Sequence, residues 1–137
     1  MKTSPLFAPS AGDIARLVAA YPFAQLFSWS ECGAWCTPLP LLLEEGEGDG
    51  GVLVGHLARG NPHVAQLRRQ PRALAVFLGA DGYVSPGWMR DRNQAPTWNH
   101  ETLQCDVEVA FDDAPDTALD KLVAHMERGA TRPWRAE

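Results

Sequence analysis

The residues best suited to chemistry lie together in one octet, Gly55-His56-Leu57-Ala58-Arg59-Gly60-Asn61-Pro62. Arg59 carries a permanent positive charge on a planar guanidinium that can bond two phosphate oxygens at once. Asn61 followed by Pro62 is typical of a helix N-cap with proline at the first helical position, and a helix N-terminus carries roughly +0.5 of a charge. We therefore expect free backbone N–H groups here, and the octet predicts a site for a phosphorylated ligand. A structural corner whose arginine makes a surface ion pair is the alternative interpretation.

Other reactive side chains do not form a recognisable site in the sequence. Three cysteines and four histidines are present, and Cys32 and Cys36 have three residues between them, which is the spacing of neither a redox pair nor half of a zinc site. We predict no metal site. No acid/base pair and no nucleophile with a histidine partner defines a substrate, so the sequence leaves an enzymatic reaction open.

The composition is that of one globular domain. The chain has 137 residues, 45% of them hydrophobic and 21% charged, and we expect a single domain over residues 1–137. The net charge of −5 argues against direct contact with nucleic acid, because proteins that bind it usually carry a basic excess. No apolar run reaches the roughly 18 residues of a membrane span, and the N-terminus lacks the apolar core of a secretion signal. Together with the odd number of cysteines, this predicts a cytoplasmic protein.

The octet must be positioned by a strand before it and a helix after it. Apolar, β-branched residues predict a strand over Val52–Leu57, and the segment Pro62–Arg69 predicts a short helix. Further elements are predicted along the chain: strands over Phe23–Trp29, Ala34–Leu43, Ala73–Leu78, Tyr83–Pro86 and Trp98–Phe111, a turn at Ala80–Gly82, a helix capped by Asp13, and a helix over Asp116–Arg128. Six strands with short connections and three helices predict a mostly β (α+β) fold, a six-stranded antiparallel barrel with short flanking helices.

Two prolines, Pro38 and Pro40, interrupt the strand predicted over Ala34–Leu43. Proline has no N–H to donate to a sheet, so it belongs at an edge or a bulge. An edge at this point leaves backbone groups of the neighbouring residues free to bond a ligand. The alternative is an irregular strand end that binds nothing.

Four segments in a fixed order carry a more specific signal. They are Pro22–Ala24, Thr37–Leu43, Gly55–Pro62, and the pair Tyr83–Pro86 with Pro96–Asn99. Through these segments the chain resembles the PaiB-type family of FMN-binding proteins, often labelled negative transcriptional regulators, over roughly residues 5–135. The resemblance implies a split-barrel fold and a homodimer with FMN at the subunit interface. Family members continue beyond the Pro133-Trp134 equivalent and have a longer loop between Trp88 and Pro96, so we expect part of one pocket wall to be missing here.

The resemblance also implies which residues bind FMN, and side-chain chemistry suggests their roles. The irregular strand would face the flavin ring, the octet would hold the phosphate, and a neighbouring strand end would add polar and stacking contacts. Three more residues would complete the pocket from the partner subunit. In this order the residues are Thr37, Pro38, Leu39 and Pro40; His56, Arg59 and Asn61; Tyr83 and Ser85; and Thr97, Trp98 and Asn99.

Three functions are compatible with this interpretation. The first is a homodimeric FMN-binding protein of regulatory or weak oxidoreductase type, in which the cofactor carries any redox chemistry. The second is a DNA-associated transcriptional repressor, as the family label suggests, although the acidic balance and the missing recognition helix argue against direct contact. The third is a flavin-free split-barrel interaction domain.

Overall fold

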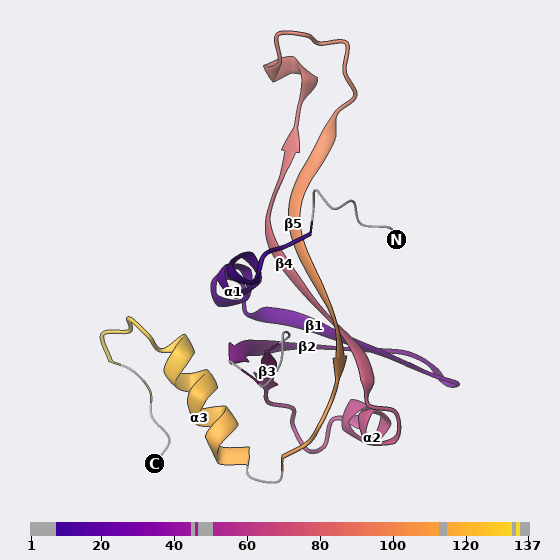
Figure 1. Ribbon diagram of the computed structural model, residues 1–137, viewed down its shortest axis with the longest axis vertical. Coiled ribbons are helices and arrows are strands. Elements are labelled where there is room, and N and C mark those ends of the chain that lie inside the picture. Colours follow the sequence, from indigo (N-terminus) through magenta and orange to yellow (C-terminus); the bar gives the residue numbers. More distant parts are fainter. Residues whose placement is uncertain (1–7, 45, 47–50, 113–114, 133, 135–137) are drawn as a thin grey trace.

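The computed structural model describes residues 8–44, 46, 51–112, 115–132 and 134. In this part of the chain one antiparallel sheet of five strands runs in the order β3-β2-β1-β4-β5 (Figure 1). The strands are β1 (Phe23–Ser30), β2 (Gly33–Glu44), β3 (Val52–Gly55), β4 (Arg72–Val84) and β5 (Thr97–Glu108). The helices are α1 (Ala11–Ala20), α2 (Pro62–Arg69), α3 (Pro115–Met126) and the 3-10 turn η2 (Pro86–Trp88).

The predicted mostly β, α+β class is confirmed, but the predicted number of strands is wrong. The segments expected as separate strands, Ala73–Leu78 and Tyr83–Pro86, are joined in β4, which continues as far as Val84. The expected turn at Ala80–Gly82 is an irregularity in the pairing with β5, where the register shifts between Leu78 and Asp81. Such an irregularity absorbs an extra residue without ending the strand. Among the described strands, β3 and β5 form opposite edges, so the sheet is open.

The core lies on one face of this sheet. Alternate residues of a strand point to opposite faces, and on β1 this places Ala24, Leu26 and Ser28 on the buried side. The core is completed by apolar residues from the other strands and from the helices: Leu39, Leu41, Ala75, Phe77 and Leu103, with Leu17 and Val18 of α1 and Leu67 of α2. The opposite face of β1 is partly open in this chain by itself, because Phe23 is 66% and Trp29 53% exposed.

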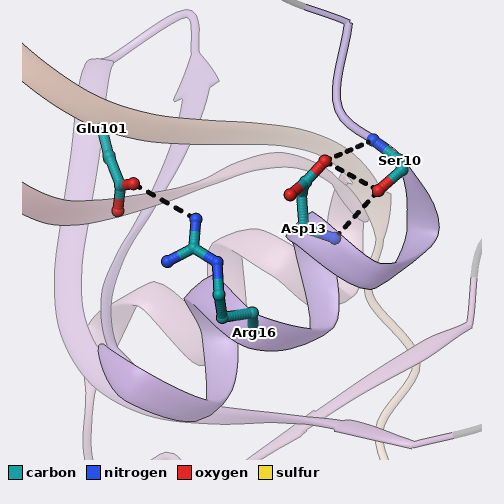
Figure 2. A network of polar contacts seen from close by, with 4 residues as sticks. All are labelled: Ser10, Asp13, Arg16 and Glu101. Atoms are coloured by element: carbon teal, nitrogen blue, oxygen red, sulfur yellow. Dashed lines mark hydrogen bonds and ion pairs between the residues drawn. The ribbon is translucent and has the colours of Figure 1, made fainter.

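Helix α1 begins with a capping box that joins Ser10 and Asp13 (Figure 2). The backbone N–H of Asp13 donates to Ser10 Oγ at 3.2 Å, and Asp13 Oδ2 accepts from the backbone N–H of Ser10 at 3.1 Å. The cap is therefore Ser10 and not Asp13, which stands at the third helical position. One turn later, Arg16 Nη2 bonds Glu101 Oε1 of β5 at 3.1 Å. This exposed contact and the buried Leu17 hold α1 against the sheet.

Strands β4 and β5 continue past the body of the sheet as a long two-stranded arm (Figure 1). We define the arm as residues 81–100, with the ladder from Asp81 opposite His100 to Val84 opposite Thr97 and η2 near its end. Closer to the body, exposure alternates along the strand predicted over Trp98–Phe111, which β5 largely matches, with Leu103 buried and Gln104 exposed. Within the described residues no helix is long and apolar enough to cross a membrane.

Candidate cofactor site

The octet forms the predicted corner between a strand and a helix. Strand β3 ends at Gly55 and α2 begins at Pro62, with Asn61 as its N-cap. Asn61 Oδ1 accepts from the backbone N–H of His63 at 3.0 Å, and its carbonyl oxygen accepts from that of Val64 at 3.0 Å. Since proline has no N–H, the first turn of α2 has no unused donor. The free N–H groups expected at the corner therefore do not belong to the helix itself.

The donors available to an anion lie in the turn just before the cap. Within the described part of the chain, the backbone N–H groups of residues 58–60 make no hydrogen bond, and Arg59 makes no ion pair. The Arg59 side chain is exposed and lies next to the N-terminal end of α2. A guanidinium, unused backbone N–H groups and the positive end of a helix dipole form a donor set that fits a phosphate group.

Thr37 and Asn61, two of the predicted site residues, are brought together by a third residue, His63. Thr37 Oγ1 lies 2.8 Å from His63 Nδ1 and 3.4 Å from Asn61 Nδ2. His63 is 1% exposed, whereas Thr37 and Asn61 are half-buried. The corner and the proline-containing strand are thus joined by hydrogen bonds and form one local site.

The two prolines lie on β2 where only one neighbouring strand is present. Pro38 and Pro40 stand opposite Gln25 and Phe23 of β1, and the pairing of β2 with β3 begins only at Leu41. The predicted edge is confirmed for this portion of β2. From Leu41 onward, β2 pairs with β3. Leu39, predicted as a site residue, points into the core and is 5% exposed, so only its backbone is available to a ligand.

His56 and Pro40, both predicted site residues, border a cavity of about 320 Å³. The opposite wall is formed by α3, including Leu119, Leu122 and Met126. His56 is exposed and directly follows β3, which packs against α3. The structure therefore gives His56 an apolar neighbourhood beside the corner, and its predicted contact with a phosphate stays a prediction.

The remaining predicted site residues lie on the arm. Tyr83 stands opposite Trp98, with ring centroids 6.0 Å apart, and Trp98 Nε1 donates to Asp81 Oδ1 at 2.8 Å. Ser85 caps η2, because its Oγ accepts from the backbone N–H of Gly87 at 3.1 Å. Thr97 and Asn99, the other two, pair with Val84 and Gly82 in the ladder of the arm.

Within one chain these two groups of predicted residues stay apart. The arm extends away from the sheet in Figure 1, and the corner at α2 lies at the far end of the molecule. The structure thus brings together the residues of β2 and the corner, and separately those of the arm. It does not bring the two groups together in a single subunit.

The sequence did not reveal a buried polar cluster behind Thr37. Ser28 Oγ of β1 lies 2.8 Å from His63 Nε2 and donates to Gln66 Oε1 at 2.7 Å. Gln66 Nε2 in turn donates to the carbonyl oxygen of Trp29 at 3.1 Å. One signal was available: Ser28 occupies a core position in the alternation of β1, and a buried hydroxyl requires a partner.

The close serine and histidine do not form a nucleophilic pair. Ser28 is fully buried, and its single hydroxyl hydrogen is donated to Gln66. His63 therefore donates to Ser28 and does not accept its proton, as a catalytic base would. Burial also lowers the pKa of His63 below its ordinary value. The cluster connects α2, β1 and β2, which is a positioning role.

The described residues contain no group of three His, Cys, Asp or Glu side chains placed to hold a metal ion. The arrangement that the fold does provide is an antiparallel sheet flanked by helices, with an arginine-bearing anion corner beside an irregular strand. This defines a small α+β domain with a donor set for a phosphorylated organic ligand.

Comparison with known proteins gives that ligand a name. The family model described as "Putative FMN-binding domain" matches residues 1–137, and the chain belongs to this family. A curated relative, the uncharacterized protein YKL070W of Saccharomyces cerevisiae (strain ATCC 204508 / S288c), is 34% identical over 71 residues. That similarity covers 49% of this chain and 42% of the relative, so the chain spans less than half the length of the relative it matches.

FMN is therefore the cofactor of this chain, and the corner fits its phosphate. Arg59 and the N–H groups of residues 58–60 supply the positive and hydrogen-bonding partners that a phosphate needs. When bound, FMN supplies the electron-transfer chemistry. The residues that would hold it are those of the two joined segments: Arg59 and Asn61 at the corner, and Thr37 on the neighbouring irregular strand.

Proposed function

We propose that this FMN-binding chain is a homodimer that holds FMN between its subunits and serves a regulatory or weak flavin-dependent oxidoreductase role of the PaiB type. The observation that carries the proposal is the division of the predicted site. Within one subunit, the corner that precedes α2 and the arm formed by β4 and β5 lie at different ends of the molecule (Figure 1). A second subunit can supply the arm that completes each site.

The surface of the arm supports this arrangement. Trp88 is 73% exposed and Trp98 59% exposed, and Tyr83 beside them is also exposed. Three large aromatic side chains on one projecting hairpin expose an apolar area that soluble single chains rarely leave uncovered. Aromatic residues of this kind are enriched where protein partners meet. A second copy of the chain would cover them, which also fits the split-barrel dimer that the family resemblance implies.

The proposal is tested by measuring cofactor and mass on the same sample. Purified protein is expected to show flavin absorbance, or to gain it on addition of FMN, and light scattering is expected to give the mass of two chains. Colourless monomer that takes up no FMN would favour a flavin-free domain. A monomer that binds FMN would overturn the proposal that FMN is held between two subunits. Salt-sensitive retardation of promoter DNA would instead favour a repressor that contacts DNA.

A matched pair of variants tests the role of the arm. Trp88→Ser is expected to shift the dimer toward monomer and to weaken FMN binding at the same time, because the arm serves both. Trp29→Ser changes an equally large exposed side chain on β1, away from the arm, and is expected to alter neither. Loss of FMN binding without any change of mass would contradict the shared interface.

A further inference from the structure

The hydrogen bonds around His63 have a direction that can be worked out atom by atom, beginning at Gln66. Gln66 Nε2 donates to the carbonyl oxygen of Trp29 at 3.1 Å, which places Oε1 toward Ser28. An amide oxygen only accepts hydrogen bonds, so Ser28 donates its single hydrogen to Gln66. Ser28 Oγ can then only accept from the other neighbour at 2.8 Å, His63 Nε2. His63 therefore carries a hydrogen on Nε2.

The other ring nitrogen then decides the direction at Thr37. The neutral ring is favoured, because burial lowers the pKa of His63 and the two ring nitrogens face hydroxyl groups and no carboxylate. A neutral ring with hydrogen on Nε2 has a bare Nδ1, which only accepts. Thr37 Oγ1, 2.8 Å away, must donate its hydrogen to Nδ1. The hydroxyl hydrogen of Thr37 is thus used inside the protein.

Asn61 is held in one orientation at the same oxygen. Its Oδ1 accepts from the backbone N–H of His63 at 3.0 Å, so its Nδ2 faces Thr37 and donates to Oγ1 at 3.4 Å. A hydroxyl oxygen has two lone pairs, and this long bond occupies one of them. Half-buried Thr37 therefore keeps one lone pair and no hydrogen for any ligand beside it.

We propose that Thr37 is an acceptor-only contact that selects an N–H group of the ligand, and that His63 is the positioning residue that sets this polarity. The inference rests on the proposed function and on the placement that the family resemblance implies, in which the strand that carries Thr37 faces the flavin ring. The pyrimidine edge of a flavin has one N–H, at N3, between two carbonyl groups. Thr37 recognises that N–H and disfavours a ligand that places a carbonyl there, because two acceptors then meet without a hydrogen between them.

The contact is tested by comparing FMN with its N3-methyl derivative, which lacks the N–H. Thr37→Val has nearly the same shape, so any steric effect of the methyl group stays the same in both proteins. Loss of the hydroxyl is expected to weaken FMN binding about tenfold and to leave binding of N3-methyl-FMN within about twofold. Thr37→Ser keeps the oxygen and is expected to retain the preference for FMN. Equal losses for both ligands in Thr37→Val would overturn the contact.

The role of His63 is tested by the ratio of the affinities for FMN and for N3-methyl-FMN. His63→Phe keeps a ring in the site but offers no acceptor, so the Thr37 hydrogen is free to turn toward the ligand. The preference for FMN over N3-methyl-FMN is expected to fall toward that of Thr37→Val. A purely structural role would lower both affinities equally, and that result would overturn the positioning role.

A measurement without any cofactor separates this inference from the proposed function. Nitrogen NMR of the cofactor-free wild-type chain is expected to show His63 as the neutral tautomer with hydrogen on Nε2. Hydrogen on Nδ1 would overturn the inference even if FMN binds. Absence of FMN binding with the expected tautomer would overturn the proposed function and the ligand contact, and the hydrogen-bond direction would stand. FMN binding that ignores Thr37 would overturn only the contact.

Discussion

The imidazole ring of His63 stacks on the indole ring of Trp35, with ring centroids 5.8 Å apart and planes inclined by 19°. Trp35 lies on β2 two positions before Thr37, so both side chains project from the same face of the strand. The stacking and the hydrogen bonds to Ser28 and Thr37 together fix the orientation of the ring. His63 therefore links α2 to the strand that carries the predicted flavin contacts.

The first prediction concerns pH. Burial lowers the pKa of His63 below its ordinary value of 6.5, so in acid the unfolded chain takes up a proton that the folded chain resists. The stabilising contribution of neutral His63 is present above the unfolded pKa and is lost as the pH falls through the folded pKa. Urea unfolding from about pH 8 to about pH 5 should show this loss. In His63→Phe this part of the pH dependence should disappear, and an unchanged slope would contradict the assignment.

The second prediction concerns the phosphate contact. Arg59→Ala is expected to weaken FMN binding by about 1.5 to 3 kcal/mol, on the order of 10- to 100-fold, because it removes a charged hydrogen bond. Titration with FMN measures the change. Arg69→Ala removes the same charge from the exposed last turn of α2 and should leave the affinity unchanged. Equal effects of the two variants would exclude a specific contact by Arg59.

The third prediction separates the two roles of Asn61. Asn61→Asp keeps an oxygen that accepts from the His63 backbone N–H, and aspartate caps helices about as well as asparagine. The helix cap should therefore be kept, and the loss of thermal stability should come from the long 3.4 Å hydrogen bond to Thr37 Oγ1, because aspartate lacks the Nδ2 donor. FMN affinity should fall roughly tenfold, because a negative charge then stands beside the phosphate. Asn61→Ala should instead lower the free energy of unfolding by about 1 kcal/mol.

The fourth prediction concerns the close packing at the end of β3. A Cβ at Gly55 would collide with Leu41 Cδ2 and lie 3.2 Å from the carbonyl oxygen of Pro40. Gly55→Ala should destabilise the fold by about 1 to 3 kcal/mol, since backbone and core must shift. Gly60→Ala lies in the same octet with nothing within 4 Å, and should stay within about 0.5 kcal/mol of wild type. Denaturant unfolding of the two variants checks the contrast.

Much of the local structure could be predicted because its causes are local. The start of α2 follows from Asn61 and Pro62, which cap and begin the helix wherever it packs. The half-exposed character of β5 follows from its alternation of apolar and polar residues. The helix near the C-terminal end stops before Gly129, which has a φ of 98° that glycine adopts without strain.

Other features could not be predicted because their causes are distant in sequence. Ala80–Gly82 has strong turn chemistry, but its pairing with β5 keeps the chain extended through an irregularity. The exposure of Phe23 and Trp29 depends on what covers that face of β1, which the alternation alone does not determine.

By itself, the sequence determined which side chains are able to bind a ligand and which local elements carry them. These elements are a strand, a corner with an arginine, a capped helix, and a strand made irregular by two prolines. Only the tertiary structure decided which side chains meet. His63 bonds Thr37, which is 26 positions away in the sequence, and Ser28, which is 35 positions away. The local pattern of apolar and polar residues does not indicate contacts between such distant positions. The physical reason is that antiparallel pairing of β1 with β2 and the packing of α2 bring Ser28, Thr37 and His63 next to one another. Polar groups that are removed from water in this way must form hydrogen bonds with each other.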